Sequence, residues 1–264
     1  MIGTGTIVCL FIAAACCFAL PIGAVIHWRR TRKARWLPFL VGALTFILFA
    51  MVLEPLLHRV CILGDNPVAR AIGANPYLYM LYGGLAAGVF EETGRYVALR
   101  WVIGKRRCPE RDTAVSYGIG HGGIEALLTV GSSLMLLAVL GLLYRSGGAE
   151  AALALTGGDR AALDTMLASL GQFTFGSCLL NVLERAAAML LHIALSIFVF
   201  LAVRDRRQWS WFPFAIALHA IADMPAGLYQ RGMLPLGVVE LWIWVVALYA
   251  LRSARKCYLE LADP

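Results

Sequence analysis

The stretch that decides the fold covers residues 174–203 and reads TFGSCLLNVLERAAAMLLHIALSIFVFLAV. Glu184, Arg185 and His192 are the charged or histidine side chains in this otherwise mostly apolar run. A helix needs about 20 apolar residues to cross the hydrocarbon core of a bilayer, which is roughly 30 Å thick. The stretch is long enough for that, so it predicts a membrane-spanning helix with ionisable side chains inside it.

The composition extends this prediction to the rest of the chain. Of its 264 residues, 60% are hydrophobic and 15% are charged, and the mean hydropathy is +0.74. Charged residues usually make up about a quarter of a soluble domain, because water covers its surface. The net charge of +7 comes from cations in short loops between apolar runs. Nucleic-acid binding is therefore not expected, and membrane lipid is the expected surroundings.

Seven apolar runs are long enough to span a membrane. They cover residues 4–26, 37–57, 76–103, 114–144, 174–203, 210–229 and 234–252. The runs are continuous rather than alternating, which excludes a β-barrel. We therefore predict an all-α, polytopic transmembrane helical bundle that forms a single domain over residues 1–264. The count becomes six or eight if the first run is cleaved or the third is split.

The loop charges predict the orientation. Cations gather in every second connection, in residues 27–35, 104–112 and 204–207 and after the last run. Cytoplasmic loops carry the excess of Lys and Arg, so we expect the N-terminus outside and the C-terminus in the cytoplasm. In residues 146–173, on the outer side, Asp159 can cap a short amphipathic helix. We expect that helix to lie on the outer membrane surface.

Ionisable residues recur inside four of the runs. A charge near the bilayer centre costs on the order of 2.5–3.5 kcal/mol on insertion scales, so such residues normally have a task or a partner. Counted from the cytoplasmic ends at about 1.5 Å per residue, their side chains come within about two helical turns of one level. We therefore predict that they form one site. The residues are Glu91, Glu92, Arg95, His121, Glu125, His192, His219 and Asp223.

This set of residue types suits metal-dependent hydrolysis. Three histidines with carboxylates and no cysteine favour a divalent metal such as zinc. A catalytic zinc uses about three protein ligands and keeps one position for water. A neighbouring glutamate can act as general base, and an arginine can stabilise developing negative charge. The expected chemistry is thus that of a metallohydrolase acting within the membrane.

Four motifs also resemble those of the CPBP superfamily, which includes the CAAX-prenyl proteases and the PrsW-like peptidases. They are EETGRY at 91–96, GHGGIEALL at 120–128, ERxxxxxxH at 184–192 and HAIAD at 219–223. The chain looks most like the bacterial YhfC-type membrane peptidases of that group. The resemblance implies an intramembrane, glutamate-dependent metalloprotease of the bacterial cytoplasmic membrane. Its expected substrate is a membrane-embedded or lipid-linked peptide.

The resemblance also implies roles for the site residues. Glu91 or Glu92 matches the water-activating glutamate, followed by Arg95 one residue sooner than the usual spacing. The ligand of the second motif is either His121 or Glu125. His192 and His219 match the later histidines and are expected as further metal ligands, and Asp223 stands in the place of the terminal Asn or Asp.

Two other functions use similar residues. Carboxylates and histidines in the membrane also serve proton-coupled transporters, but the sequence shows no internal repeat of the kind that many transporters carry. A non-catalytic scaffold could keep the polar network for packing or for binding a partner helix. The metalloprotease is the prediction that accounts for all four motifs.

Overall fold

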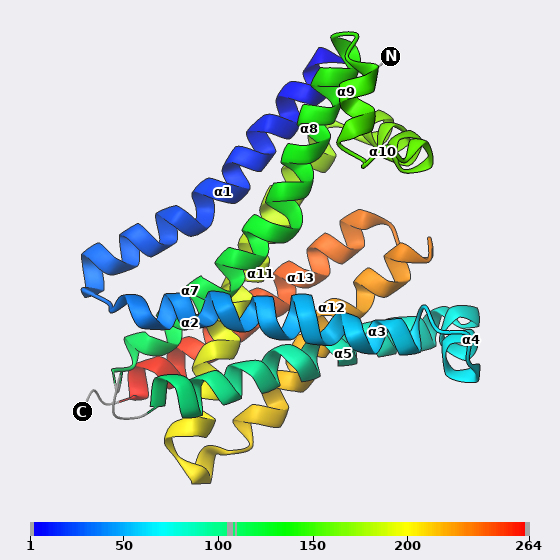
Figure 1. Cartoon of the computed structure of the whole chain (residues 1–264). Coiled ribbons are helices and arrows are strands. Elements are labelled where there is room, and N and C mark those ends of the chain that lie inside the picture. Colours follow the sequence, from blue (N-terminus) through cyan, green and yellow to red (C-terminus); the bar gives the residue numbers. More distant parts are fainter. Residues whose placement is uncertain (1–2, 105–107, 109, 262–264) are drawn as a thin grey trace. The chain divides into compact units, whose positions relative to one another are not determined.

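The computed structural model describes residues 3–104, 108 and 110–261, and within these residues it is helical with no strand (Figure 1). Six of its helices are long and apolar enough to cross a membrane. They are Thr4–Arg32, Trp36–Cys61, Asp112–Arg145, Phe175–Arg204, Arg206–Gln230 and Leu236–Glu260. The predicted all-α membrane fold is confirmed.

The third predicted run, 76–103, is also helical. It forms α5 (Pro76–Val97), which continues directly into η2 (Ala98–Ile103). The helix is not among the six candidate spans, because Glu91, Glu92 and Arg95 lower its hydropathy. The side chains that define the predicted site are thus the ones that make this helix less apolar. Seven helical runs agree with the predicted range of six to eight spans.

Short π-helical segments interrupt three of the predicted runs. They are η1 (Ile47–Leu53), η2 and η3 (Ala126–Gly131). Such segments are rare and often lie at functional sites. Here η2 begins three residues after Arg95, and η3 begins directly after Glu125. The sequence analysis predicted continuous helices at all three places.

The remaining elements join or complete these helices. Their bounds are α1 (Thr4–Arg32), α2 (Trp36–Phe46), α3 (Glu54–Cys61), α4 (Pro67–Ala74), α7 (Asp112–Glu125), α8 (Ser132–Arg145), α9 (Ala149–Ala154), α10 (Arg160–Gln172), α11 (Phe175–Arg204), η4 (Arg206–Gln208), α12 (Trp211–Gln230) and α13 (Leu236–Glu260).

The chain groups into two compact units, and each is described separately. The first comprises residues 1–22 and 125–186, and the second comprises residues 23–124 and 187–264. In the first unit, buried apolar side chains from α1, α8, α9, α10 and α11 form one core, which includes Leu10, Leu134, Leu140 and Leu170. The helix α10 begins after Asp159, whose side chain accepts a hydrogen bond from Ala162 N at 3.1 Å. This is the predicted cap.

In the second unit, α5 packs most extensively on α12. Gly84 and Gly88 allow this approach, since a Cβ atom there would lie 2.5 Å from Ala220 O and 2.7 Å from Ile216 O. Small residues at helix contacts are how membrane helices come close to one another. The contact fixes α5 and α12 side by side, with the acidic pair of α5 facing the histidine of α12.

Two predictions about the membrane stay predictions. One is the orientation, and the other is the single domain with its outer 146–173 segment. Of the cations that carry the orientation, Lys105, Arg106 and Arg107 lie outside the described residues.

Candidate metal centre

The acidic motif of α5 is buried. Glu91 is 7% exposed, and Glu92 and Arg95 are 0% exposed. Glu92 and Arg95 are three residues apart on the helix, and Arg95 Nη2 lies 3.4 Å from Glu92 Oε1. A buried charge is tolerated only with a partner. Glu92 and Arg95 therefore form an ion pair on one helix, which gives Glu92 surroundings different from those of the adjacent Glu91.

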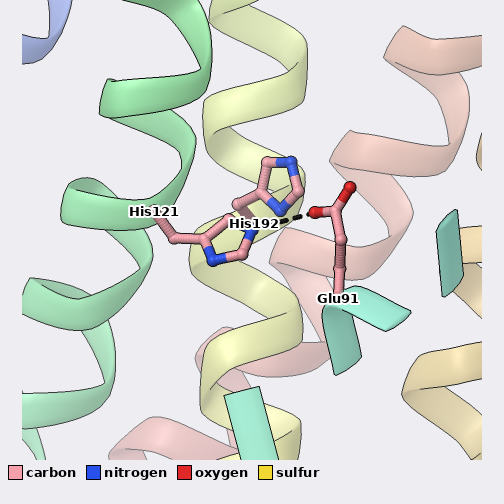
Figure 2. Close-up of side chains that lie close together, drawn as sticks. All are labelled: Glu91, His121 and His192. Carbon is pink, nitrogen blue, oxygen red and sulfur yellow. Dashed lines mark hydrogen bonds and ion pairs between the residues drawn. The ribbon is translucent and has the colours of Figure 1, made fainter. Parts of the chain in front are cut away.

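Glu91 turns toward two histidines from other helices. Its Oε2 lies 2.8 Å from Nε2 of His121 on α7, and the ring of His121 lies 4.8 Å from that of His192 on α11, centroid to centroid. Figure 2 shows the carboxylate directed at the two rings. One ligand atom from each of the three residues lies within 4.8 Å of the others. The three residues are buried and can hold a metal ion together.

Glycines on α7 explain how the two histidines meet. A Cβ at Gly118 would lie 2.6 Å from Ile193 Cα, and a Cβ at Gly122 would lie 3.2 Å from His192 Cβ. Gly118 lies three residues before His121, and Gly122 follows His121 directly. Because they carry no side chain, α7 can lie close to α11. These two glycines therefore bring His121 beside His192.

Arg95 fixes the second histidine. Its Nη1 donates to the carbonyl oxygen of His192 at 3.1 Å, and its Nη2 lies 3.0 Å from His192 Nδ1. A guanidinium has donors and no acceptor, so Nδ1 accepts in this contact. One arginine therefore contacts Glu92 on its own helix and His192 on α11, and it orients both.

His219 on α12 lies between carboxylates. Its Nδ1 lies 2.8 Å from Glu92 Oε1, and its Nε2 lies 3.3 Å from Asp223 Oδ2 and 4.0 Å from Glu91 Oε2. Its ring centroid is 5.3 Å from that of His192. The i, i+4 spacing on α12 places Asp223 within ion-pair distance of His219. Asp223 is the most open member, with 38% of its side chain exposed.

Glu125 has a different set of neighbours. It belongs to the first unit, where its Oε1 accepts from Arg185 Nη1 at 2.7 Å. Arg185 also pairs with Glu184 and contacts Thr129. His121, in contrast, belongs to the second unit and contacts Glu91 directly. The geometry of the second motif thus gives His121 the contact with the acidic motif, and it gives Glu125 an ion pair with an arginine.

The chain matches one known family over most of its length. A family profile described as YhfC intramembrane metalloprotease matches residues 16–250. The chain belongs to this family. A YhfC family relative in Bacillus subtilis (strain 168), named as the uncharacterized membrane protein YhfC, is 36% identical over 262 residues. That match covers 98% of this chain and 100% of the relative. No solved structure gives a significant match.

The residues of this YhfC family member fit a divalent metal by their chemistry. A carboxylate and two imidazoles are ligands that divalent transition metals accept. In the part of the chain that the structure describes, His121 Nδ1 and Glu92 Oε2 are buried with no hydrogen-bond partner. Unsatisfied buried polar atoms are costly and call for an explanation such as an ion or water. The site thus has polar capacity that the protein's own contacts do not use.

Aromatic residues complete the surroundings of His121. Its ring meets Phe46 edge-on at 5.3 Å and lies 6.0 Å from Tyr117, nearly parallel to it. The guanidinium of Arg95 lies over the Tyr117 ring, 5.9 Å from its centroid. Tyr117, four residues before His121, is 0% exposed. Phe46 is a site neighbour that the sequence did not reveal, because nothing distinguishes it from other apolar residues of its run.

Proposed function

We propose that the protein is an intramembrane metalloprotease that hydrolyses a peptide bond in a membrane-embedded or lipid-linked substrate. The observation that carries this proposal is the buried group of Glu91, His121 and His192, which come from α5, α7 and α11. Intramembrane ionisable residues are costly and normally functional. Membership of a family described as intramembrane metalloproteases supports the same reaction.

The proposed metal is zinc, held by Glu91, His121 and His192. A bound zinc would supply a Lewis acid and would lower the pKa of its water toward about 7. The three donors come from α5, α7 and α11. Their rigid helices keep the donors in fixed positions, which a catalytic site needs.

We assign the working carboxylate to Glu91. Oε1 of Glu92 already contacts His219 and Arg95, whereas Glu91 faces His121 and the second nitrogen of His219. A carboxylate has two oxygens, so Glu91 can offer one as a ligand and accept a proton from water at the other. Glu92 then serves to orient His219 and to balance Arg95.

His219 and Asp223 are proposed to act on the substrate. Carboxylates only accept, so His219 donates from Nδ1 to Glu92. Its Nε2 points at Asp223 and Glu91 and can donate to the oxygen of a peptide carbonyl as negative charge develops there. Such donors typically contribute 10²–10³ in rate. Asp223 orients this nitrogen from the more open side of the site.

The surroundings fit a reaction that excludes bulk water. The three donors and Arg95 are at most 7% exposed, and the flanking helices are membrane-spanning candidates. We place the protein in the bacterial cytoplasmic membrane, in keeping with its Bacillus relative. Its N-terminus is proposed to lie outside. Its partners would then be membrane lipid and a peptide that enters from within the bilayer.

The test compares the parent with Glu91→Gln in liposomes that also carry a solubilised bacterial membrane-protein extract. The reaction is run in ¹⁸O-labelled water, and peptide mass spectrometry locates new C-termini that carry the label. We expect labelled termini with the parent and a loss of at least about 10²-fold with the variant, since a general base typically contributes 10²–10⁴. Equal labelling from both proteins would contradict the assignment.

A scaffold without catalysis is the second candidate. It is favoured by Arg95, which pairs with Glu92 on α5 and donates to His192 on α11. A purely structural residue would join two helices in this way. If the protein is such a scaffold, the parent gives no labelled termini, and Glu91→Gln does not differ from it. Thermal unfolding of the same variant completes the comparison, because a scaffold residue would change stability and a catalytic residue would not need to.

A further inference from the structure

A polar hollow lies in the second unit, and the residues that form it are not those of the metal centre. It has a volume of about 300 Å³ and is lined by Tyr96, Arg100, Ala202, Arg206 and Trp209. These residues come from α5, η2, α11 and the segment around η4. A single water needs only about 10–15 Å³ of such space. The hollow is therefore large enough for a polar group of several atoms.

The charge of this hollow is one-sided. Arg100 and Arg206 line it, and none of the lining residues that the structure describes is acidic. Neither arginine forms an ion pair within the described residues, whereas Arg70 and Arg185 pair with acids at 2.6 and 2.7 Å. Two guanidinium groups at one hollow repel each other unless an anion lies between them. Arginine is also the side chain that best matches the oxygens of a phosphate, through paired N–H donors.

Aromatic rings support the same hollow. Tyr96 and Trp209 both contact Phe212, with centroid distances of 4.8 and 6.4 Å. Trp209 is 54% exposed. Trp and Tyr gather where a membrane meets water, with their rings at the level of the lipid headgroups. The hollow thus joins an exposed aromatic surface to two cations.

The residues of the hollow lie at the ends of long helices, where lipid headgroups are expected. Arg206 and Trp209 lie in the short segment between α11, which ends at Arg204, and α12, which begins at Trp211. Arg100 lies in the last turns of the α5–η2 helix. This is the end that the loop cations predict to be cytoplasmic, and anionic lipids of that leaflet attract basic pockets between helices.

We propose that this hollow binds the phosphate of an anionic phospholipid headgroup. The phosphate oxygens accept hydrogen bonds from Arg100 and Arg206, Tyr96 and Trp209 lie beside the glycerol region, and the acyl chains extend into the bilayer. Such a site lies one helical turn from Arg95, since Tyr96 and Arg100 follow it on the same helix. It does not depend on whether the metal centre is active.

The experiment uses the full chain in an uncharged detergent. The probe is short-chain phosphatidylglycerol, whose binding is measured by native mass spectrometry and by the shift in melting temperature. Short-chain phosphatidylcholine and inorganic phosphate are tested in parallel. The test variant is Arg100→Gln with Arg206→Gln. The matched control is Arg252→Gln with Arg255→Gln, which removes the same charge at exposed positions of α13.

We expect phosphatidylglycerol to bind the parent and the control equally. The test variant should bind it at least about tenfold more weakly, because it loses the charge-assisted hydrogen bonds of two guanidinium groups. Equal weakening in the control would overturn the proposal, because it would show a general charge effect. Inorganic phosphate that binds as tightly as the lipid would overturn the lipid as the source. If the double variant melts early, Arg206→Gln alone decides, because that side chain is exposed.

Discussion

Replacing Arg95 by glutamine is expected to destabilise the protein strongly. Arg95 and Glu92 are both 0% exposed and lie 3.4 Å apart, so the variant leaves a buried carboxylate that keeps its contact with His219 but loses the guanidinium. Removing one partner of a buried ion pair costs about 3–5 kcal/mol. The carbonyl oxygen and Nδ1 of His192 also lose their donors, which adds to the cost where glutamine cannot replace them.

For a chain of this size, about 1 kcal/mol corresponds to roughly 2–4 °C in melting temperature. The expected decrease is therefore about 6–20 °C. The assay heats the detergent-solubilised protein with a thiol-reactive reagent and follows labelling of Cys108 by peptide mass. Cys108 is 2% exposed and lies in the same unit as Arg95, so it reacts when that unit opens.

A second variant isolates the ion pair from general damage. Adding Glu92→Gln to Arg95→Gln removes the uncompensated buried charge, so the double variant should melt closer to the parent than Arg95→Gln does. Arg252→Gln, at an exposed position, should change the melting temperature little. If Arg95→Gln melted within about 2 °C of the parent, the buried pair would not have the energetic role that its geometry implies.

Three further changes are expected to act at defined places. Gly84→Ala should lower the free energy of unfolding by several kcal/mol, because its Cβ would lie 2.5 Å from Ala220 O. Gly83→Ala is the control: a Cβ there has nothing within 4 Å and should stabilise the helix by about 0.5–1 kcal/mol. Chemical unfolding of the two variants checks this. Asp223→Asn should reduce hydrolysis roughly 10²-fold with little change in melting temperature, since its side chain is 38% exposed; a similar loss of stability would contradict a role on the substrate. Arg185→Gln should lower the melting temperature by several degrees, because it leaves Glu125 beside Glu184 without the cation between them. Arg70→Gln, at an exposed pair, is its control and should have almost no effect.

Much of the fold follows from hydropathy alone. The runs at 4–26, 37–57 and 174–203 correspond to helices because twenty apolar residues have few alternatives in a bilayer. The π-helical segments could not be predicted in this way. An extra residue in one turn depends on which neighbours press on the helix, and neither η1 nor η3 has a distinctive composition.

The sequence predicted that the site residues lie at a similar depth in the membrane. It did not predict which of them contact one another. The spacing of residues on each helix placed His121 and His192 at similar depth, and the structure brings them into contact. Spacing cannot say which face of one helix meets another. That is why His121 and Glu125, four residues apart, could not be separated by sequence, although one contacts Glu91 and the other Arg185.

The two adjacent glutamates present the same problem. Neighbouring residues on a helix point about 100° apart, so only one of them can face a given partner. Arg95, three residues on, could pair with Glu92, and the contacts of His219 with both carboxylates depend on how α12 packs on α5. The glycines that permit this packing were visible in the sequence, but the helix they contact was not.

The most direct test of the metal centre is the metal content of the purified protein, measured by inductively coupled plasma mass spectrometry. We predict about one equivalent of zinc in the parent, which is lost in His121→Ala and in His192→Ala while both variants stay folded. Arg70→Ala, at an exposed ion pair, should retain the metal. A parent free of divalent metal, or histidine variants that keep it in full, would contradict the central claim that Glu91, His121 and His192 hold a metal ion.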